Sequence, residues 1–164
     1  MNIHYNQIID DLNRHQYIWL VTGGAGFIGS NLIEFLLDNG QIVRALDNYS
    51  TGRPSTIDEL TDFAKTRNCF QNFVFIENDI RDLKVCREIV GNVDYVLHQA
   101  AIGSVPRSIE EPVNTHESNI NGFLNILLAS KDANIKRFVY ASSSSIYGDC
   151  QDSPKKEHNS GRLL

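Results

Sequence analysis

One strand–turn–helix segment near the N-terminus constrains the fold of this chain more than any other feature. An apolar run over residues 17–21 predicts a buried strand, and apolar residues at helical spacing begin at Ile28. Between them stand three glycines at three-residue spacing, Gly23, Gly26 and Gly29. In this context the first permits a tight turn, the second lets a pyrophosphate approach the backbone, and the third packs helix on strand. The segment therefore favours a dinucleotide-binding turn over an ordinary glycine turn.

Strands and helices alternate along the rest of the chain. Apolar runs predict strands at residues 17–22, 42–47, 73–77, 95–100 and 138–142. The segments between them predict helices at about 28–39, 83–90 and 114–133, and a helix or loop at 55–67. This alternation is typical of a Rossmann-type α/β fold, a doubly wound parallel sheet, and right-handed crossovers predict the strand order 3-2-1-4-5. We expect an N-terminal helix within 1–16, a nucleotide-binding domain over 17–148 and an irregular tail over 149–164.

Composition limits the partners and the compartment. The net charge of −5 disfavours nucleic acid and anionic membranes as partners. We expect no membrane partner, because the chain has neither an apolar run of about 18 residues nor the features of a secretory signal. Cys69, Cys86 and Cys150 are odd in number and widely spaced, which favours reduced cytoplasmic thiols over disulfides. The histidines are scattered, so no metal site is expected.

Residues at the ends of other predicted strands fit the same nucleotide site. Asp47 stands 18 residues after Gly29, where a carboxylate accepts hydrogen bonds from ribose hydroxyls and repels a 2′-phosphate. This carboxylate therefore favours NAD over NADP as the cofactor. The alternative interpretation is that Asp47 is an ordinary solvated aspartate at the end of a strand. Asp79 and Ile80 follow the third strand, within reach of an adenine ring if they face the ligand. The segment 99–101 ends the fourth strand, and its small side chains allow a ligand to approach the backbone closely.

Four successive hydroxyls, Ser142 to Ser145, follow the fifth strand. They either bind and orient a polyol or form an ordinary serine turn. A nucleophilic serine needs an adjacent base, and no histidine follows nearby in the sequence, so a hydrogen-bonding role is favoured. His98 lies inside an apolar run and is interpreted as a hydrogen-bonded core histidine rather than a base.

These segments together resemble the extended short-chain dehydrogenase/reductase family, which includes NAD-dependent epimerases and dehydratases. The resemblance spans about residues 16–157 and is carried by segments 22–29, 46–52, 78–82, 98–101 and 142–149. The stretch 100–109 is similar to the form found in bacterial UDP-N-acetylglucosamine 4-epimerases. Related enzymes use the uronic acid of the same sugar nucleotide in surface polysaccharide synthesis.

The resemblance implies a role for each matching residue. The positions that hold NAD are matched by Gly23, Gly26, Phe27, Ile28, Gly29, Asp47, Asn48, Thr51, Gly52, Asp79, Ile80, Gln99, Ala100, Ala101 and Ser118. Those facing a UDP-sugar are matched by Gly103, Ser104, Ser142, Ser143 and Ser144, of which Ser143 matches the catalytic serine. In such enzymes NAD takes a hydride from C4 of the sugar and returns it to the other face, which inverts that carbon.

Two local features qualify the expected activity. Dehydratases of the family carry an acidic residue where Ser145 stands here, which favours epimerisation over 4,6-dehydration. The family's Tyr-x-x-x-Lys motif is absent, so we expect an N-terminal half that is inactive alone, with a sheet incomplete on its C-terminal side. The family's homodimer is in doubt for such a chain. The alternatives are an NAD-binding module without catalysis and a fragment of a 4,6-dehydratase.

Overall fold

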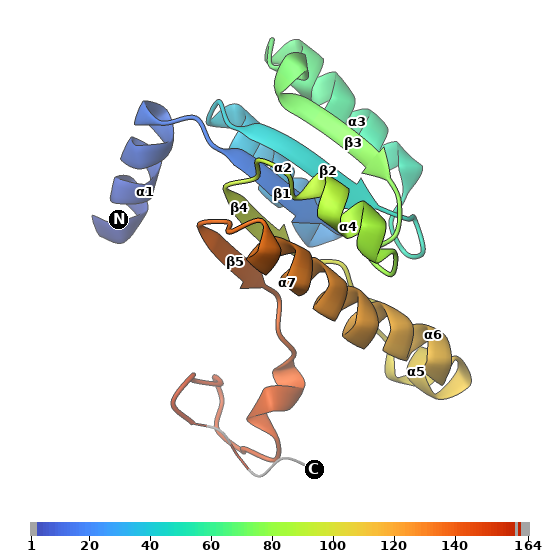
Figure 1. Ribbon diagram of the computed structural model, residues 1–164. Coiled ribbons are helices and arrows are strands. Elements are labelled where there is room, and N and C mark those ends of the chain that lie inside the picture. The colour runs from blue at the N-terminus through green and yellow to red at the C-terminus, as the bar shows by residue number, and fades with distance from the viewer. Residues whose placement is uncertain (1–2, 160, 162–164) are drawn as a thin grey trace.

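The computed structural model describes residues 3–159 and 161, and its centre is one parallel sheet (Figure 1). The strands are β1 (Ile18–Thr22), β2 (Ile42–Asp47), β3 (Phe73–Glu77), β4 (Tyr95–His98) and β5 (Arg137–Tyr140). Their order is β3-β2-β1-β4-β5 and every neighbouring pair is parallel. The predicted fold class and strand order are confirmed. All carboxyl ends of the strands therefore meet at one edge of the sheet, where ligands of such sheets bind.

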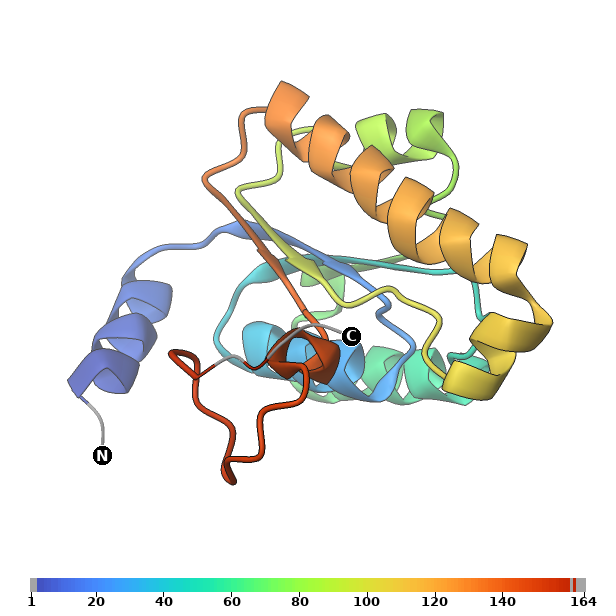
Figure 2. The same ribbon diagram turned by 90° about the horizontal axis from the view of Figure 1, so that it is seen from below.

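Helices cover the sheet on both sides (Figure 2). One face packs against α2 (Phe27–Asp38) and α3 (Pro54–Thr66), and the other packs against α4 (Leu83–Ile89) and α7 (Phe123–Asp132). Successive residues of β1 enter opposite layers: Val21 joins the cluster under α2 and α3, and Leu20 joins the cluster under α4 and α7. Burial on both faces explains the continuous apolar runs of the central strands.

The N-terminal helix α1 (Ile3–Arg14) lies beside the sheet rather than over its centre (Figure 1). The predicted helix is confirmed, but its packing is slighter than its apolar face suggested. Leu12 is buried, whereas Tyr5 and Ile8 are about half exposed. Gln41 holds the end of the helix to the domain, because its side-chain amide donates to the carbonyls of Leu12 and His15 at 2.9 and 3.0 Å.

Most departures from the predicted elements follow the carboxyl ends of β4 and β5. The helix expected over 114–133 consists of α6 (Pro112–His116), the π-helical turn η2 (Glu117–Gly122) and α7. Three further short elements were not predicted: η1 (Phe70–Asn72), α5 (Val105–Glu110) and η3 (Ser144–Tyr147). The fourth and fifth strands end two residues earlier than expected, and the residues that follow them line a cavity.

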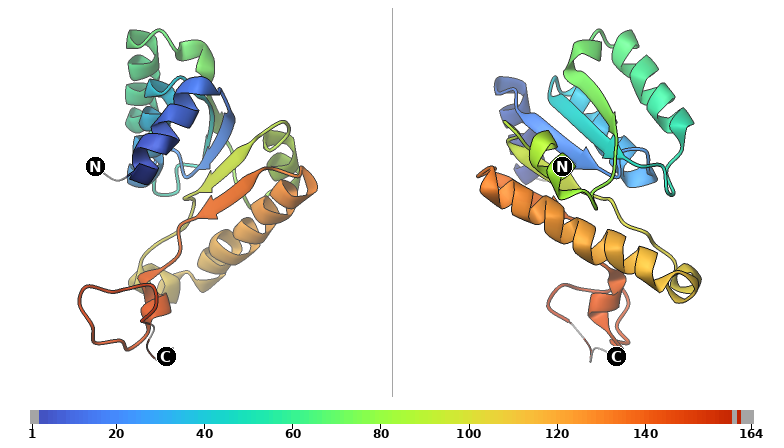
Figure 3. Two further views of the ribbon diagram at one scale, coloured as in Figure 1. Left: turned by 90° about the vertical axis from the view of Figure 1, so that its left-hand side faces the viewer. Right: turned by 45° about the vertical axis from the view of Figure 1, so that its right-hand side comes forward.

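Strand β5 is an edge strand, and the end of the described chain does not cover it. Val139 on this strand is 47% exposed. Figure 3 shows η3 and the segment after it lying beyond the carboxyl end of β5, away from the helical layers. Within the described part of the chain, no helix is long and apolar enough to cross a membrane.

Candidate cofactor site

The glycine turn after β1 leads directly into the N-terminus of helix α2. Gly23 has a φ of 72°, and a Cβ there would lie 2.8 Å from the amide nitrogen of Ala100. Only glycine meets both conditions without strain. Gly26 then caps helix α2 without a side-chain hydrogen bond to its first N–H groups. These free donors and the bare Cα form a site suited to phosphate oxygens.

Asp47 connects this turn to the end of β2. Its carboxylate is buried and accepts hydrogen bonds from the N–H of Ala25 at 3.0 Å and the N–H of Tyr49 at 2.8 Å, one on each oxygen. Gly52 closes over the carboxylate, since a Cβ there would lie 3.0 Å from Asp47 Oδ1. Each carboxylate oxygen has lone pairs beyond the one these bonds use. Asp47 is therefore held rigidly and can still accept from a diol.

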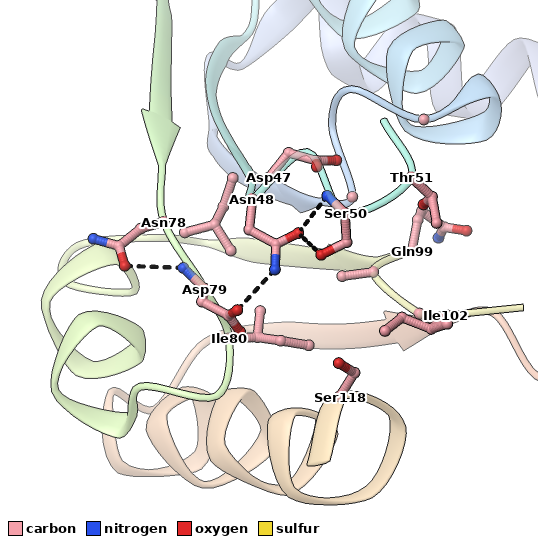
Figure 4. Close-up of a pocket in the computed structure, with 15 residues that line it drawn as sticks. Asp47, Asn48, Ser50, Thr51, Asn78, Asp79, Ile80, Gln99, Ile102 and Ser118 are labelled. Atoms are coloured by element: carbon pink, nitrogen blue, oxygen red, sulfur yellow. Dashed lines mark hydrogen bonds between the residues drawn. The ribbon is translucent and has the colours of Figure 1, made fainter. Parts of the chain in front are cut away.

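A cavity at the carboxyl ends of β1, β2, β3 and β4 gathers most of the predicted cofactor residues (Figure 4). Its predicted lining residues are Gly23, Gly26, Asp47, Asn48, Thr51, Asp79, Ile80, Gln99, Ala100, Ala101 and Ser118. It is also lined by Leu46, Ser50, Asn78 and Ile102, which the sequence reasoning missed. All four directly neighbour predicted residues in the chain, so a wider window at each strand end finds them.

Four predicted cofactor residues do not line this cavity. Phe27 is 85% exposed and borders, with Thr51, a separate groove between α2 and α3. The side chain of Ile28 is also exposed. Gly29 and Gly52 act on the shape of the site instead, because a Cβ at Gly29 would collide with the Gly23 carbonyl and one at Gly52 with Ala25.

The outer wall of the cavity is a hydrogen-bonded cluster at the ends of β2 and β3. Asn48 Nδ2 donates to Asp79 Oδ2 at 2.7 Å, and Asn48 Oδ1 accepts from the N–H of Ser50 at 3.0 Å (Figure 4). Burial of the Asp79 carboxyl opposes its charged form, but hydrogen bonds from Arg81 and Asn48 outweigh this effect and lower its pKa below the usual value. Asp79 is thus a fixed anionic acceptor at this wall.

The π-helical turn places Ser118 against the cavity. Ser118 is buried there, and the next residue, Asn119, binds the backbone of Ile102 at both its N–H (2.8 Å) and its carbonyl (2.9 Å). Gly122 follows, and a Cβ at this position would lie 2.7 Å from the Ile80 side chain. The turn therefore positions the loop after β4 and allows helix α7 to approach Ile80. Nothing in the sequence marked Asn119, because a polar residue in a helix is usually solvated.

His98 is a buried hydrogen-bonded histidine, as predicted. Its Nδ1 lies 2.7 Å from Thr22 Oγ1, and its ring packs between Phe123 and Phe138. Burial lowers the pKa of His98 to about 4, so the ring is neutral at pH 7. It joins the ends of β1 and β4 without carrying charge into the site.

The predicted sugar-facing residues are only partly brought together. Ser142 and Ser143 border a second cavity at the ends of β4 and β5, beside Gln99 and Ala100. Ser143 Oγ accepts from the N–H of Ser145 at 3.1 Å and caps η3. The other three predicted positions, Gly103, Ser104 and Ser144, line neither cavity. Ser104 has a φ of 137°, an unfavourable value for a residue with a Cβ.

A parallel sheet with a glycine turn and acidic strand ends defines a dinucleotide-binding protein of the Rossmann type. More particularly, the chain belongs to the NAD dependent epimerase/dehydratase family, whose sequence profile matches residues 19–163. NAD is the cofactor of that family. In the described residues no group of three histidine, cysteine or acidic side chains is arranged to hold a metal.

Known proteins similar to this chain include UDP-sugar 4-epimerases. A UDP-glucose 4-epimerase of Lactobacillus helveticus is 34% identical over 131 residues, which make up 79% of this chain and 36% of that protein. The UDP-glucose 4-epimerase of Stenotrophomonas maltophila, crystallised with NAD and formylated UDP-arabinopyranose, gives a TM-score of 0.79 at 32% identity over 92% of this chain and 44% of that one.

The UDP-N-acetylglucosamine 4-epimerase of Methanobrevibacter ruminantium M1, in complex with UDP-N-acetylmuramic acid, gives a TM-score of 0.75 at 34% identity. The match covers 88% of this chain and 43% of that one. The chain therefore spans less than half the length of these relatives.

Proposed function

We propose that this chain is the NAD-binding part of a UDP-sugar 4-epimerase. The observation that carries the proposal is the convergence of a bare glycine turn, a fixed Asp47 and an anionic Asp79 on one cavity at the carboxyl ends of the strands. The glycine turn binds the pyrophosphate, Asp47 accepts from the adenosine ribose, and Asp79 with Ile80 contacts the adenine. Family membership and the NAD complexes of similar proteins support this assignment.

The remaining predicted residues serve the nicotinamide side of the cavity. Gln99, Ala100 and Ala101 follow β4 at its carboxyl end, between the first cavity and the one bordered by Ser142 and Ser143. NAD, when bound, accepts hydride from C4 of a sugar and returns it. In this proposal the hydroxyl of Ser143 hydrogen-bonds the sugar hydroxyl at C4. The buried His98 is neutral at pH 7, so it places no positive charge beside the nicotinamide end of the site.

For the substrate we propose a UDP-N-acetylhexosamine, or its uronic acid, used in surface polysaccharide synthesis. The resemblance of residues 100–109 to the N-acetylglucosamine enzymes and the similarity to the Methanobrevibacter ruminantium enzyme support this choice. Ser144 and Ser145 offer no carboxyl group for elimination, which favours epimerisation over dehydration. None of the tyrosines has a lysine four residues later, so these residues alone are not expected to turn over the sugar.

The cofactor assignment is tested by titrating NAD and NADP into the purified chain by calorimetry. We expect NAD to bind more tightly than NADP by about tenfold or more, because Asp47 repels the 2′-phosphate and gains no bond from it. Asp47→Asn removes the charge with little change in side-chain size, and its amide nitrogen cannot accept the second backbone N–H, so the preference for NAD over NADP should narrow. Asp132→Asn, on an exposed residue of α7, is the matched control and should leave both affinities unchanged. Equal binding of NAD and NADP by the native chain contradicts the assignment.

A further inference from the structure

Arg81 makes more polar contacts to the outer wall of the cofactor cavity than its place in an exposed loop suggests. Its Nη2 and Nε donate to Asp79 Oδ2 at 2.7 and 3.0 Å, and its backbone N–H donates to Asp79 Oδ1 at 2.8 Å. Asn48 adds a fourth donor to this carboxylate, on Oδ2. The guanidinium thus fixes the carboxylate through two bonds that converge on Oδ2, a paired contact from a rigid planar group that lysine cannot reproduce.

The far side of the same guanidinium is held by the helix that borders the cavity. Arg81 Nη1 donates to Asn114 Oδ1 at 3.1 Å and lies 3.5 Å from Glu117 Oε2. From α7, Asn125 Nδ2 donates to the backbone carbonyls of Ile80 and Arg81 at 3.1 and 2.9 Å. The loop after β3 is therefore fixed to α6, η2 and α7, and Arg81 transmits that rigidity to Asp79.

These bonds determine which part of Asp79 remains available to a ligand. The described contacts place three side-chain donors on Oδ2 and one backbone donor on Oδ1, so Oδ1 keeps a lone pair. The Asp79 side chain is 24% exposed and lines the cavity next to the buried Ile80, whose side chain offers an apolar contact. An acceptor beside an apolar surface suits a planar base that carries an amino group.

We propose that Arg81 is a positioning residue that holds Asp79 Oδ1 as the acceptor for the 6-amino group of a purine. Through Asp79 it selects a 6-aminopurine dinucleotide over a 6-oxopurine one. The inference rests on the proposed NAD site and goes beyond it, because Arg81 itself does not contact the base. Loss of the guanidinium frees the carboxylate to turn toward solvent or toward Asn48, and the amino group then loses its fixed partner.

The test compares the affinities of the chain for NAD and for nicotinamide hypoxanthine dinucleotide, which carries an oxygen in place of the 6-amino group. The native chain should prefer NAD by about tenfold, the discrimination expected for one hydrogen bond to a charged acceptor. Arg81→Met should reduce this ratio to about twofold or less, and Arg81→Lys should give an intermediate ratio, because it restores the charge without the paired bonds. Arg87→Met, on an exposed residue of α4, is the matched control and should keep the native ratio.

A double-variant cycle separates positioning from a general loss of structure. Asp79→Asn should also abolish the preference, and adding Arg81→Met to it should change the ratio no further, because Arg81 acts through Asp79. Unchanged discrimination in Arg81→Met, or a further change in the double variant, overturns the role of Arg81 while NAD binding stands. Failure of the native chain to bind NAD overturns the proposed site and this inference together.

Discussion

Acidification from pH 8 to pH 5 is expected to destabilise this fold through His98. In the folded chain burial holds the pKa of His98 at about 4, whereas an unfolded histidine has its ordinary value of 6.5. The unfolded state therefore binds more protons between these two values, so stability is complete above pH 6.5 and is lost as the pH falls toward 4. The resulting loss of unfolding free energy is about 2 kcal/mol at pH 5 and about 3 kcal/mol at pH 4.

The assay is chemical denaturation at pH 8.0, 6.5 and 5.0, with thermal melting as a second readout, where the loss at pH 5 corresponds to roughly 4–8 °C. Asp79 and Asp94 also have lowered pKa values, from hydrogen bonds that outweigh their burial. The stability that these two aspartates contribute is lost only as the pH falls below their unfolded-state pKa values near 4. Above pH 5 the pH dependence of stability therefore reports the contribution of His98.

The matched variant is His98→Asn, whose side-chain oxygen can still accept from Thr22. This variant is less stable at pH 8 because the aromatic cluster around it loses packing, but its stability should change little between pH 8 and pH 5. His116→Asn, on an exposed histidine, should keep the native pH dependence. Equal pH dependence in His98→Asn and the native chain, or titration of the His98 ring near pH 6.5 by NMR, refutes the reasoning.

Three further outcomes follow from single features of the structure. Gly23→Ala places a Cβ against Ala100 at a positive φ and should cost about 2 kcal/mol or more in denaturant unfolding. Gly122→Ala should displace Ile80 and weaken NAD binding by about tenfold in calorimetry, whereas the exposed Gly40→Ala should not, although its positive φ of 69° costs some stability. Chromatography of reactions with UDP-N-acetylglucosamine should detect no epimer, and measurable turnover by the purified chain overturns that expectation.

The strand order was predictable because its causes are local. Continuous apolar runs identify strands that are buried on both faces. A helix between each pair of successive strands indicates parallel strands joined by right-handed crossovers. Gly23 was likewise predictable from spacing alone, because the tight turn and the close approach to β4 both exclude a side chain. Where the chain leaves regular periodicity, prediction failed. The π-helical turn at Glu117–Gly122 adds backbone that a 3.6-residue pattern does not register.

The candidate site was predictable only in part. Asp47 and Asp79 could be predicted because the strand ends converge at one edge of the sheet. Carboxylates at that edge can accept hydrogen bonds from the ribose and the base of a nucleotide. Asn119 could not be found, because its two bonds to Ile102 depend on how the turn in the helix faces a loop 17 residues earlier. Arg81 was missed for the same reason: its partners on α6 and η2 come together only in the folded chain. The NAD-binding roles of Phe27 and Ile28 remain predictions, since their side chains lie outside the cavity.

Binding of NAD in the cavity at the strand ends is best measured by amide chemical-shift mapping of the labelled chain during an NAD titration. We expect saturable shifts at Gly23–Gly26, around Asp47, at Asp79 and Ile80, and at residues 99–101. Shifts confined to the groove between α2 and α3, or no saturable shifts at millimolar NAD, contradict binding in that cavity.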